Sequence, residues 1–75
     1  MNIQINVIGK ILTGENSGCY IKVKDDSDAT GGYLILTSST SDFSDGFDNW
    51  VANLPQLTAY FEEANWRVQW FENEE

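Results

Sequence analysis

The residues of this chain that could do chemistry are mostly carboxylates. Its 75 residues include twelve aspartates and glutamates, four lysines and arginines, one cysteine and no histidine. Without histidine there can be no Ser-His-Asp triad, no Cys-His dyad and no histidine metal site. Cys19 alone cannot form a thiolate zinc site, and no glycine-rich phosphate loop occurs. We therefore predict that the protein is not an enzyme and needs neither a cofactor nor a metal.

Two carboxylate motifs overlap in one short segment. Asp26, Asp28 and Thr30 spell D-x-D-x-T, the nucleophile motif of haloacid dehalogenase-type phosphatases, which need a domain much longer than 75 residues. With Gly31 the same residues resemble the start of an EF-hand calcium loop. Thr37 then stands at the twelfth position, where that loop needs a glutamate. We interpret both motifs as turn sequence.

The densest group of carboxylates lies in residues 41–50, SDFSDGFDNW, which hold three aspartates and three aromatic residues. Acids near a helix N-terminus interact favourably with the helix dipole, and Asp42 or Ser44 could cap such a helix. Capping does not explain the further glutamates in the C-terminal sequence FENEE, or a second phenylalanine, Phe43, beside Phe47. The segment therefore predicts either a capped helix start or a surface for a positively charged partner.

Alternating apolar residues predict three strands in the first half of the chain. Ile3, Ile5 and Val7 share one face of a predicted strand at residues 3–8, which continues beyond Gly9. Residues 19–24, CYIKVK, alternate again, and residues 32–38, GYLILTS, form a mostly apolar run typical of a central strand. Turn-forming sequences connect these segments, so we expect an antiparallel meander.

The spacing of apolar residues becomes helical in the second half. Two sets of four residues show it: Phe47, Trp50, Val51 and Leu54, then Leu57, Tyr60, Phe61 and Ala64. Pro55 separates the sets and Asn53 is a good N-cap, so we expect two short helices or one kinked helix. Asn65 is expected to end the helix in a left-handed conformation. Residues 66–71, WRVQWF, alternate as a final strand.

These elements predict a single α+β domain over residues 1–75 in the order β-β-β-α-β. The expected sheet is mixed and four-stranded, with the helical segment on one face and the last strand parallel to the third and, by default, beside it. Trp66 and Trp70 are expected to fill the space between helix and sheet, and Tyr20, Tyr33 and Phe71 to face outward. The predicted core consists of Ile3, Ile5, Val7, Ile21, Val23, Leu34, Leu36, Trp50, Val51, Leu54, Leu57, Phe61 and Val68.

The acids should gather at the two ends of this fold. The end at which the first strand finishes is expected to hold Glu15, Asp42, Asp45, Asp48, Glu72, Glu74 and Glu75. The opposite end is expected to hold Asp25, Asp26, Asp28, Glu62 and Glu63. Carboxylates steer a basic partner and exposed aromatic side chains anchor it. We therefore predict a partner-binding surface made of Asp42, Phe43, Asp45, Asp48, Phe71, Glu72 and Glu74.

The net charge of −8 indicates the kind of partner. Nucleic acid and anionic membranes would repel such a chain, so neither is expected to bind directly. No run approaches the roughly 20 apolar residues of a membrane span, and the N-terminal sequence alternates, unlike a signal peptide. We expect a cytoplasmic protein whose partner is a basic protein.

The sequences TGGYLILTSS, GFDNWVANL and FEEANWRVQWFE, on a compact acidic chain, resemble the small immunity proteins of bacterial toxin–immunity systems, including contact-dependent inhibition and polymorphic toxins. The resemblance implies a cytoplasmic protein without catalytic residues that is a monomer when free. It also implies a heterodimer in which the protein covers the basic active site of its cognate toxin, most often a DNase or RNase. Two alternatives stay open: a phage- or plasmid-encoded nucleic-acid mimic that inhibits a host defence enzyme, and an adaptor that self-associates through its sheet.

Overall fold

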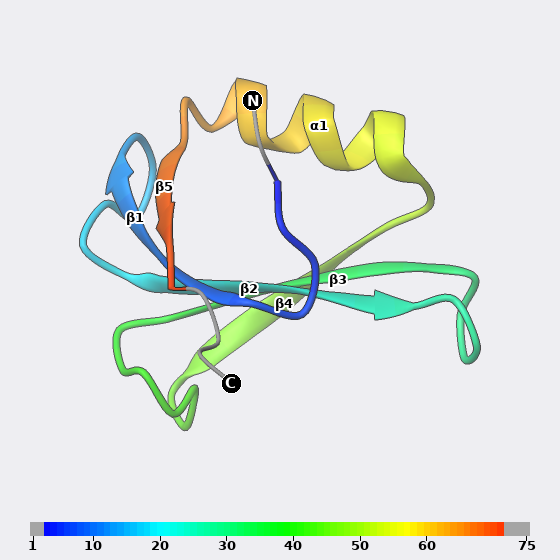
Figure 1. Ribbon diagram of the computed structural model, residues 1–75, viewed down its shortest axis with the longest axis horizontal. Helices are drawn as coiled ribbons and strands as arrows, with labels where there is room; N and C mark the ends of the chain where they lie inside the picture. The colour runs from blue at the N-terminus through cyan, green and yellow to red at the C-terminus, as the bar shows by residue number, and fades with distance from the viewer. Residues whose placement is uncertain (1–2, 72–75) are drawn as a thin grey trace.

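The computed structural model describes residues 3–71, except for the side chain of Phe47, as a five-stranded antiparallel sheet with one helix on one face (Figure 1). The elements are β1 (Ile8–Thr13), β2 (Tyr20–Asp26), β3 (Gly32–Ser38), β4 (Gly46–Val51), α1 (Leu54–Glu63) and β5 (Arg67–Trp70). The strands lie in the order β4-β3-β2-β1-β5. The predicted α+β class is confirmed, but the sheet has a fifth strand and contains only antiparallel pairs.

The additional strand is β4, where the sequence had predicted a helix. β3 and β4 pair along their whole length, from Ser38 opposite Gly46 to Tyr33 opposite Val51. Successive side chains of a strand point to opposite faces, so Val51 is buried under the helix while Trp50 is 49% exposed on the other face. The helical spacing of these residues is therefore coincidental, and their aromatic and β-branched side chains suit a strand.

Because β4 is a strand, α1 and β5 run in the direction opposite to the one predicted. The chain leaves β4 at the end of the sheet opposite to the one expected, and α1 carries it back (Figure 1). β5 then runs antiparallel to β1, with Gly9 opposite Trp70 and Ile11 opposite Val68. The expected place beside the third strand is wrong, because β4 occupies that edge.

The part of the predicted helical segment that follows Asn53 is confirmed, with Asn53 as its N-cap. The Asn53 side chain accepts a hydrogen bond from the Gln56 amide at 2.9 Å, and Pro55 lies in the first turn, where a missing amide donor costs little. Leu57 and Phe61 are fully buried against the sheet. Asn65 follows the helix in a left-handed conformation, with φ 59°. Leu54–Glu63 is one helix. The helical segment predicted before it is wrong, because Phe47, Trp50 and Val51 belong to β4.

The hydrophobic core lies between α1 and the sheet. Five of its predicted members are buried there: Ile21, Val23, Val51, Leu57 and Phe61. Four further residues complete it: Ile11, Ile35, Ala64 and Trp66. Ile3, Ile5, Val68 and Trp70 pack against its margin, and Val7 is half-buried.

Four predicted core residues lie outside the core. Ile35 faces the helix, so its neighbours Leu34 and Leu36 point to the open face of the sheet, where they are half-buried. Trp50 is on the same face, and Leu54, at the start of the helix, is 53% exposed. β3 carries apolar residues on both of its faces, so the sequence alone could not decide which face the helix covers.

Residues 3–7 form no strand, contrary to the prediction. They run from the level of the helix down to the sheet (Figure 1). Asn6 turns the chain with φ 63°, and its amide donates to the Val23 carbonyl at 2.6 Å. β1 therefore begins only at Ile8.

The end of the helix is fastened to the turn between β1 and β2. The Trp66 indole Nε1 donates to the Glu15 carbonyl at 2.5 Å, and the Glu15 amide donates to the Ala64 carbonyl at 3.1 Å. Trp66 also packs edge-on against Phe61, with ring centroids 5.0 Å apart. Gly14 lies so close to this joint that a Cβ on it would come within 2.3 Å of the Ala64 oxygen.

Gly14 and Gly18 provide a matched test of this joint. Their φ angles are 92° and 93°, but a Cβ at Gly18 would meet nothing within 4 Å. Gly18→Ala should cost about 1–2 kcal/mol, the penalty of a left-handed alanine. Gly14→Ala should cost about 1–3 kcal/mol more, because the added methyl group must push the helix end away. Urea denaturation of both variants measures the difference, and equal losses would contradict the close contact.

Candidate functional site

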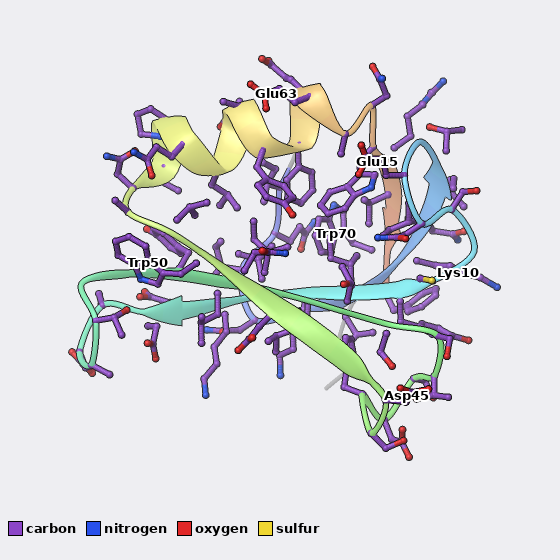
Figure 2. The ribbon with its side chains drawn as sticks, turned by 180° about the vertical axis from the view of Figure 1, so that it is seen from behind. Lys10, Glu15, Asp45, Trp50, Glu63 and Trp70 are labelled. Carbon is purple, nitrogen blue, oxygen red and sulfur yellow. The ribbon has the colours of Figure 1, made fainter. Side chains whose placement is uncertain are left out.

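Acidic side chains from three parts of the chain lie along one end of the molecule, on both sides of the sheet. Glu15 comes from the β1–β2 turn, and Glu63 from the last turn of α1; both line one shallow hollow. Asn16, next to Glu15, lines a second hollow together with Asp45 of the β3–β4 loop. Figure 2 shows Glu15 and Asp45 at the same end of the molecule as Lys10, with Glu15 on the helix side of the sheet and Asp45 on the side away from the helix. We call this surface the acidic end, and it comprises the exposed residues Glu15, Asp42, Asp45, Glu62 and Glu63.

Only part of the predicted acidic surface lies here. Glu62 and Glu63 were expected at the opposite end, and the chain reversal by β4 brings them to this one. Asp48 lies on the open face of β4, opposite Leu36, instead of at the end. Glu72, Glu74 and Glu75 lie outside the described residues.

Phe71 does not join the other predicted binding residues. It follows β5, whereas Asp48 belongs to β4, and these two strands form opposite edges of the sheet. Phe71 is 41% exposed and packs near Tyr20, with ring centroids 6.4 Å apart. Phe43 remains close to Asp48, because both line a hollow of about 270 Å³ beside Leu36.

Asp42 caps a turn within the β3–β4 loop and does not start a helix. Its Oδ1 accepts hydrogen bonds from the Ser44 amide at 3.0 Å and the Thr40 hydroxyl at 2.9 Å. The Ser44 amide, followed by the Thr40 hydroxyl, lowers the pKa of Asp42, because both bonds favour the carboxylate form. Phe43, at the bend of this turn, has φ 59°. The turn holds the Asp42 charge at a fixed place at the acidic end.

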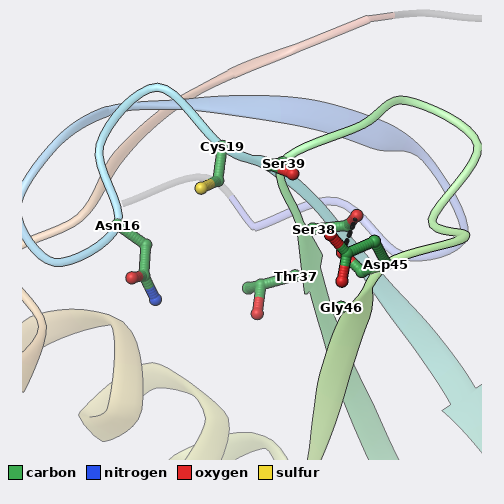
Figure 3. A pocket seen from close by; sticks show the side chains of 7 residues that line it. All are labelled: Asn16, Cys19, Thr37, Ser38, Ser39, Asp45 and Gly46. Carbon is green, nitrogen blue, oxygen red and sulfur yellow. Dashed lines mark hydrogen bonds between the residues drawn. The ribbon is translucent and has the colours of Figure 1, made fainter.

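The acidic end contains a polar pocket of about 240 Å³ (Figure 3). It is lined by Asn16, Cys19, Thr37, Ser38, Ser39, Asp45 and Gly46. The Ser38 hydroxyl donates to the Asp45 carbonyl at 2.5 Å and so closes the base of the β3–β4 loop. Thr37 is only 5% exposed, and its hydroxyl has no hydrogen-bond partner. Sequence reasoning missed this pocket, although Thr37, a polar residue in an apolar strand, was the available signal.

The open face of the sheet is a second exposed surface. Three lysines project from it: Lys10 on β1 and Lys22 and Lys24 on β2. Lys22 and Lys24 lie opposite Leu36 and Leu34, and the Lys10 ammonium lies 5.6 Å from the Tyr20 ring centroid. The prediction of an outward-facing Tyr33 is wrong, because Tyr33 packs against the core.

The described residues show no other candidate chemistry. Residues 3–71 contain no group of three or more aspartates, glutamates or cysteines that could hold a metal ion, and their one helix is too short to cross a membrane. Searches of family models, curated proteins and solved structures found no match to the chain. The acidic end, with its pocket, is therefore the strongest candidate site.

The Asp42 turn predicts a specific response to acid. A lowered pKa means that the hydrogen bonds stabilise the loop fully above pH 3.8 and that this contribution is lost as the pH falls through the lowered pKa. The carboxyl carbon of Asp42 and the amide proton of Ser44 should therefore titrate together in an NMR experiment, below pH 3.8. Thr40→Val should move this titration towards higher pH.

Asp25 provides the internal control. Its Oδ1 accepts the Ser27 amide at 2.9 Å, the same arrangement at the far end of the sheet, and this bond lowers the pKa of Asp25. Thr40→Val should leave the Asp25 titration unchanged. An Asp42 that titrates at or above pH 3.8 in the unmodified protein would contradict the described turn.

Proposed function

We propose that this protein is an inhibitor that binds a basic partner protein through its acidic end, as the immunity protein of a toxin–immunity pair does in the cytoplasm. The partner is a nuclease toxin whose phosphate-binding cleft is positively charged. Carboxylates fixed on a rigid surface substitute there for the phosphates of nucleic acid and exclude the substrate. Opposite charges also accelerate the encounter, to as much as ~10⁸–10⁹ M⁻¹s⁻¹ at low salt.

The placement of Glu62 and Glu63 is the observation that carries this proposal. Both lie in the last turn of α1, where the negative end of the helix dipole disfavours acids, and the first turn holds none. Stability alone would place them at the other end of the helix. Together with Glu15 they outnumber the one cation nearby among the described residues, Arg67 at the start of β5 opposite Thr13, and so leave a local excess of negative charge that the fold does not need. A positively charged partner gives this excess a use.

The fold holds these charges in fixed relative positions. The bond between the Glu15 amide and the Ala64 carbonyl joins the β1–β2 turn to the helix end. The Ser38–Asp45 bond and the Asp42 turn fix the β3–β4 loop. A surface that is already ordered loses less conformational entropy on binding than a mobile one.

A nucleic-acid mimic that acts on a host defence enzyme would use the same surface. The identity of the partner separates it from an immunity protein, because a toxin and a restriction or other defence enzyme differ in activity. The third alternative is self-association. It is favoured by the exposed Trp50, which lies on the open face of the sheet in the edge strand β4. Size-exclusion chromatography with light scattering tests it: a monomer at all concentrations would exclude it.

Charge-neutral variants test the proposed function directly. The acidic-end variant combines Glu15→Gln, Asp45→Asn and Glu63→Gln. The control variant combines Asp25→Asn, Asp26→Asn and Asp28→Asn in the β2–β3 turn at the far end of the sheet. Each removes three charges from a net −8. The acidic-end variant should associate with the partner about tenfold more slowly at low salt, and the control should stay within about twofold of the unmodified protein.

The measurement begins with capture of the partner from cells of the source organism on the immobilised full chain. Stopped-flow association at several ionic strengths, and inhibition of the partner's nuclease activity, are then measured for the three proteins. The acidic-end variant should show a flatter dependence of rate on salt. Equal slopes for the two variants, or a captured partner without nuclease activity, would refute the proposal.

A further inference from the structure

The two edges of the sheet differ in how well they are protected against pairing with another strand. β5 has four residues, carries Arg67, and pairs with β1 across a register shift between Ile11 and Thr13. β4 has six residues, pairs with β3 in continuous register, and contains neither proline nor lysine. Short strands, bulges, lysine and proline are the features by which natural proteins prevent pairing at an edge. β4 has none of them.

The outer hydrogen-bonding groups of β4 are free. Part of the amide and carbonyl groups of an edge strand point away from its neighbour in the sheet. Within residues 3–71, no residue outside β3 hydrogen-bonds to the backbone of Gly46–Val51. Figure 2 shows β4 across the front of the molecule, between the labelled Asp45 and Trp50, with no other segment in front of it. The edge is therefore open to a further strand.

Trp50 leaves this edge uncovered and adds an apolar surface beside it. Its indole Nε1 donates to the Thr30 hydroxyl at 2.8 Å, and a Cβ on Gly32 would come within 2.6 Å of the same nitrogen. The ring therefore lies back over the start of β3, on the open face of the sheet, and Trp50 is 49% exposed. An apolar side chain from a strand beside β4 would pack against it.

The charge along β4 determines what kind of strand fits. Asp48 is the one charged residue of β4 and lies on the open face, two positions from Trp50. Asp42 and Asp45 lie in the loop that leads into the strand, and residues 32–53 contain no lysine or arginine. A second copy of β4 and its loop would bring three more aspartates and no cation, so like charges disfavour it. A strand with basic residues is complementary.

We infer that the edge of β4 binds an extended segment of the basic partner, which adds a further strand to the sheet. Main-chain hydrogen bonds to Gly46–Val51 hold the segment at about 4.8 Å from β4. Its residues beside Asp48 and Trp50 lie on the open face, so the segment carries a lysine or arginine and, two positions away, an apolar residue. That the strand belongs to this partner rests on the proposed function, whereas the free edge does not. The acidic end attracts the partner, and β4, which begins next to Asp45, fixes its orientation.

A disulfide-closed β-hairpin peptide tests the edge without the partner. Its outer strand reads Thr-Lys-Thr-Val-Thr, which places the basic and the apolar side chain on one face. The hairpin should shift the amide NMR signals of Gly46–Val51 saturably, with a dissociation constant in the millimolar range. Those amides of β4 that exchange rapidly with solvent in the free protein should exchange about tenfold more slowly at a hairpin concentration of about nine times the dissociation constant.

Two control hairpins separate main-chain pairing from charge attraction. N-methylation of the amides that point outward from the probe strand removes its donors and should weaken binding at least about tenfold, because more than one hydrogen bond is lost. Glutamate in place of the lysine puts like charges side by side and should weaken binding about fivefold. An N-methylated hairpin that binds as well as the parent hairpin would overturn the inference.

Two variants of the protein locate the side-chain contacts. Asp48→Asn should weaken binding of the lysine hairpin by about threefold, and Asp28→Asn, in the β2–β3 turn, is the matched control that should change nothing. Trp50→Thr should also weaken binding by about threefold. Its control is Phe71→Thr, which removes an aromatic side chain of similar exposure, 41%, beyond the other edge strand. The β4 amides that bond to β3 should stay protected from exchange in every variant, which shows that the sheet is intact.

The outcomes separate this inference from the proposed function. Saturable binding of the lysine hairpin at β4 that N-methylation abolishes would support the edge, even if the captured partner is not a nuclease. Shifts centred on β5, no saturable shift, or a captured partner that leaves the rapidly exchanging β4 amides unprotected would overturn it, even if association depends on the acidic end. If the same β4 signals shift with protein concentration alone, a second copy occupies the edge, and the inference is overturned as well.

Discussion

Trp66 fills the corner between the end of α1, the β1–β2 turn and the start of β5. Its ring lies 5.5 Å from that of Tyr60 and 5.0 Å from that of Phe61, and its indole N–H is satisfied by a main-chain carbonyl of the turn. A domain of 75 residues has a small core, so one buried aromatic side chain, worth about 1.5–3 kcal/mol of burial, is a substantial share of its stability. Trp66 also directly precedes β5, which pairs with β1.

The Trp66 corner also determines the electrostatics of the molecule. It brings Glu15 and Glu63 to one hollow, and Glu62 precedes Glu63 in the chain. These like charges repel one another. The negative end of the helix dipole also disfavours Glu62 and Glu63. Burial of Trp66 and Phe61 offsets this repulsion. Hydrophobic packing thus holds together an arrangement of charges that would not form on electrostatic grounds.

The sequence was sufficient for the elements with local signals and insufficient for those decided by tertiary contacts. Asn53, Pro55 and Asn65 mark the helix ends by their own conformational preferences, and the structure agrees. Residues 46–51 carry no such marker, because the spacing of Trp50 and Val51 suits a helix and their propensity suits a strand. Pairing with β3 decides between them, and that information lies outside the segment.

The error over β4 also concealed part of the candidate site. It placed Glu62 and Glu63 at the wrong end of the fold, so the acidic end could be predicted only through Glu15, Asp42 and Asp45. The orientation of β3 was a second obstacle. Because Leu34 and Leu36 are as apolar as Ile35, the sequence did not show that Thr37 faces the helix side, where it is buried.

The two exposed surfaces differ in how far the fold itself accounts for them. On the open face, Lys22 and Lys24 lie opposite Leu36 and Leu34, and their aliphatic stems can cover these leucines while the ammonium groups stay in water. The Trp50 indole N–H is satisfied by the Thr30 hydroxyl at 2.8 Å. This face therefore has a structural explanation as the solvent side of the sheet. The acidic end has none for Glu62 and Glu63, and proteins depart from local stability rules mainly where they bind or react.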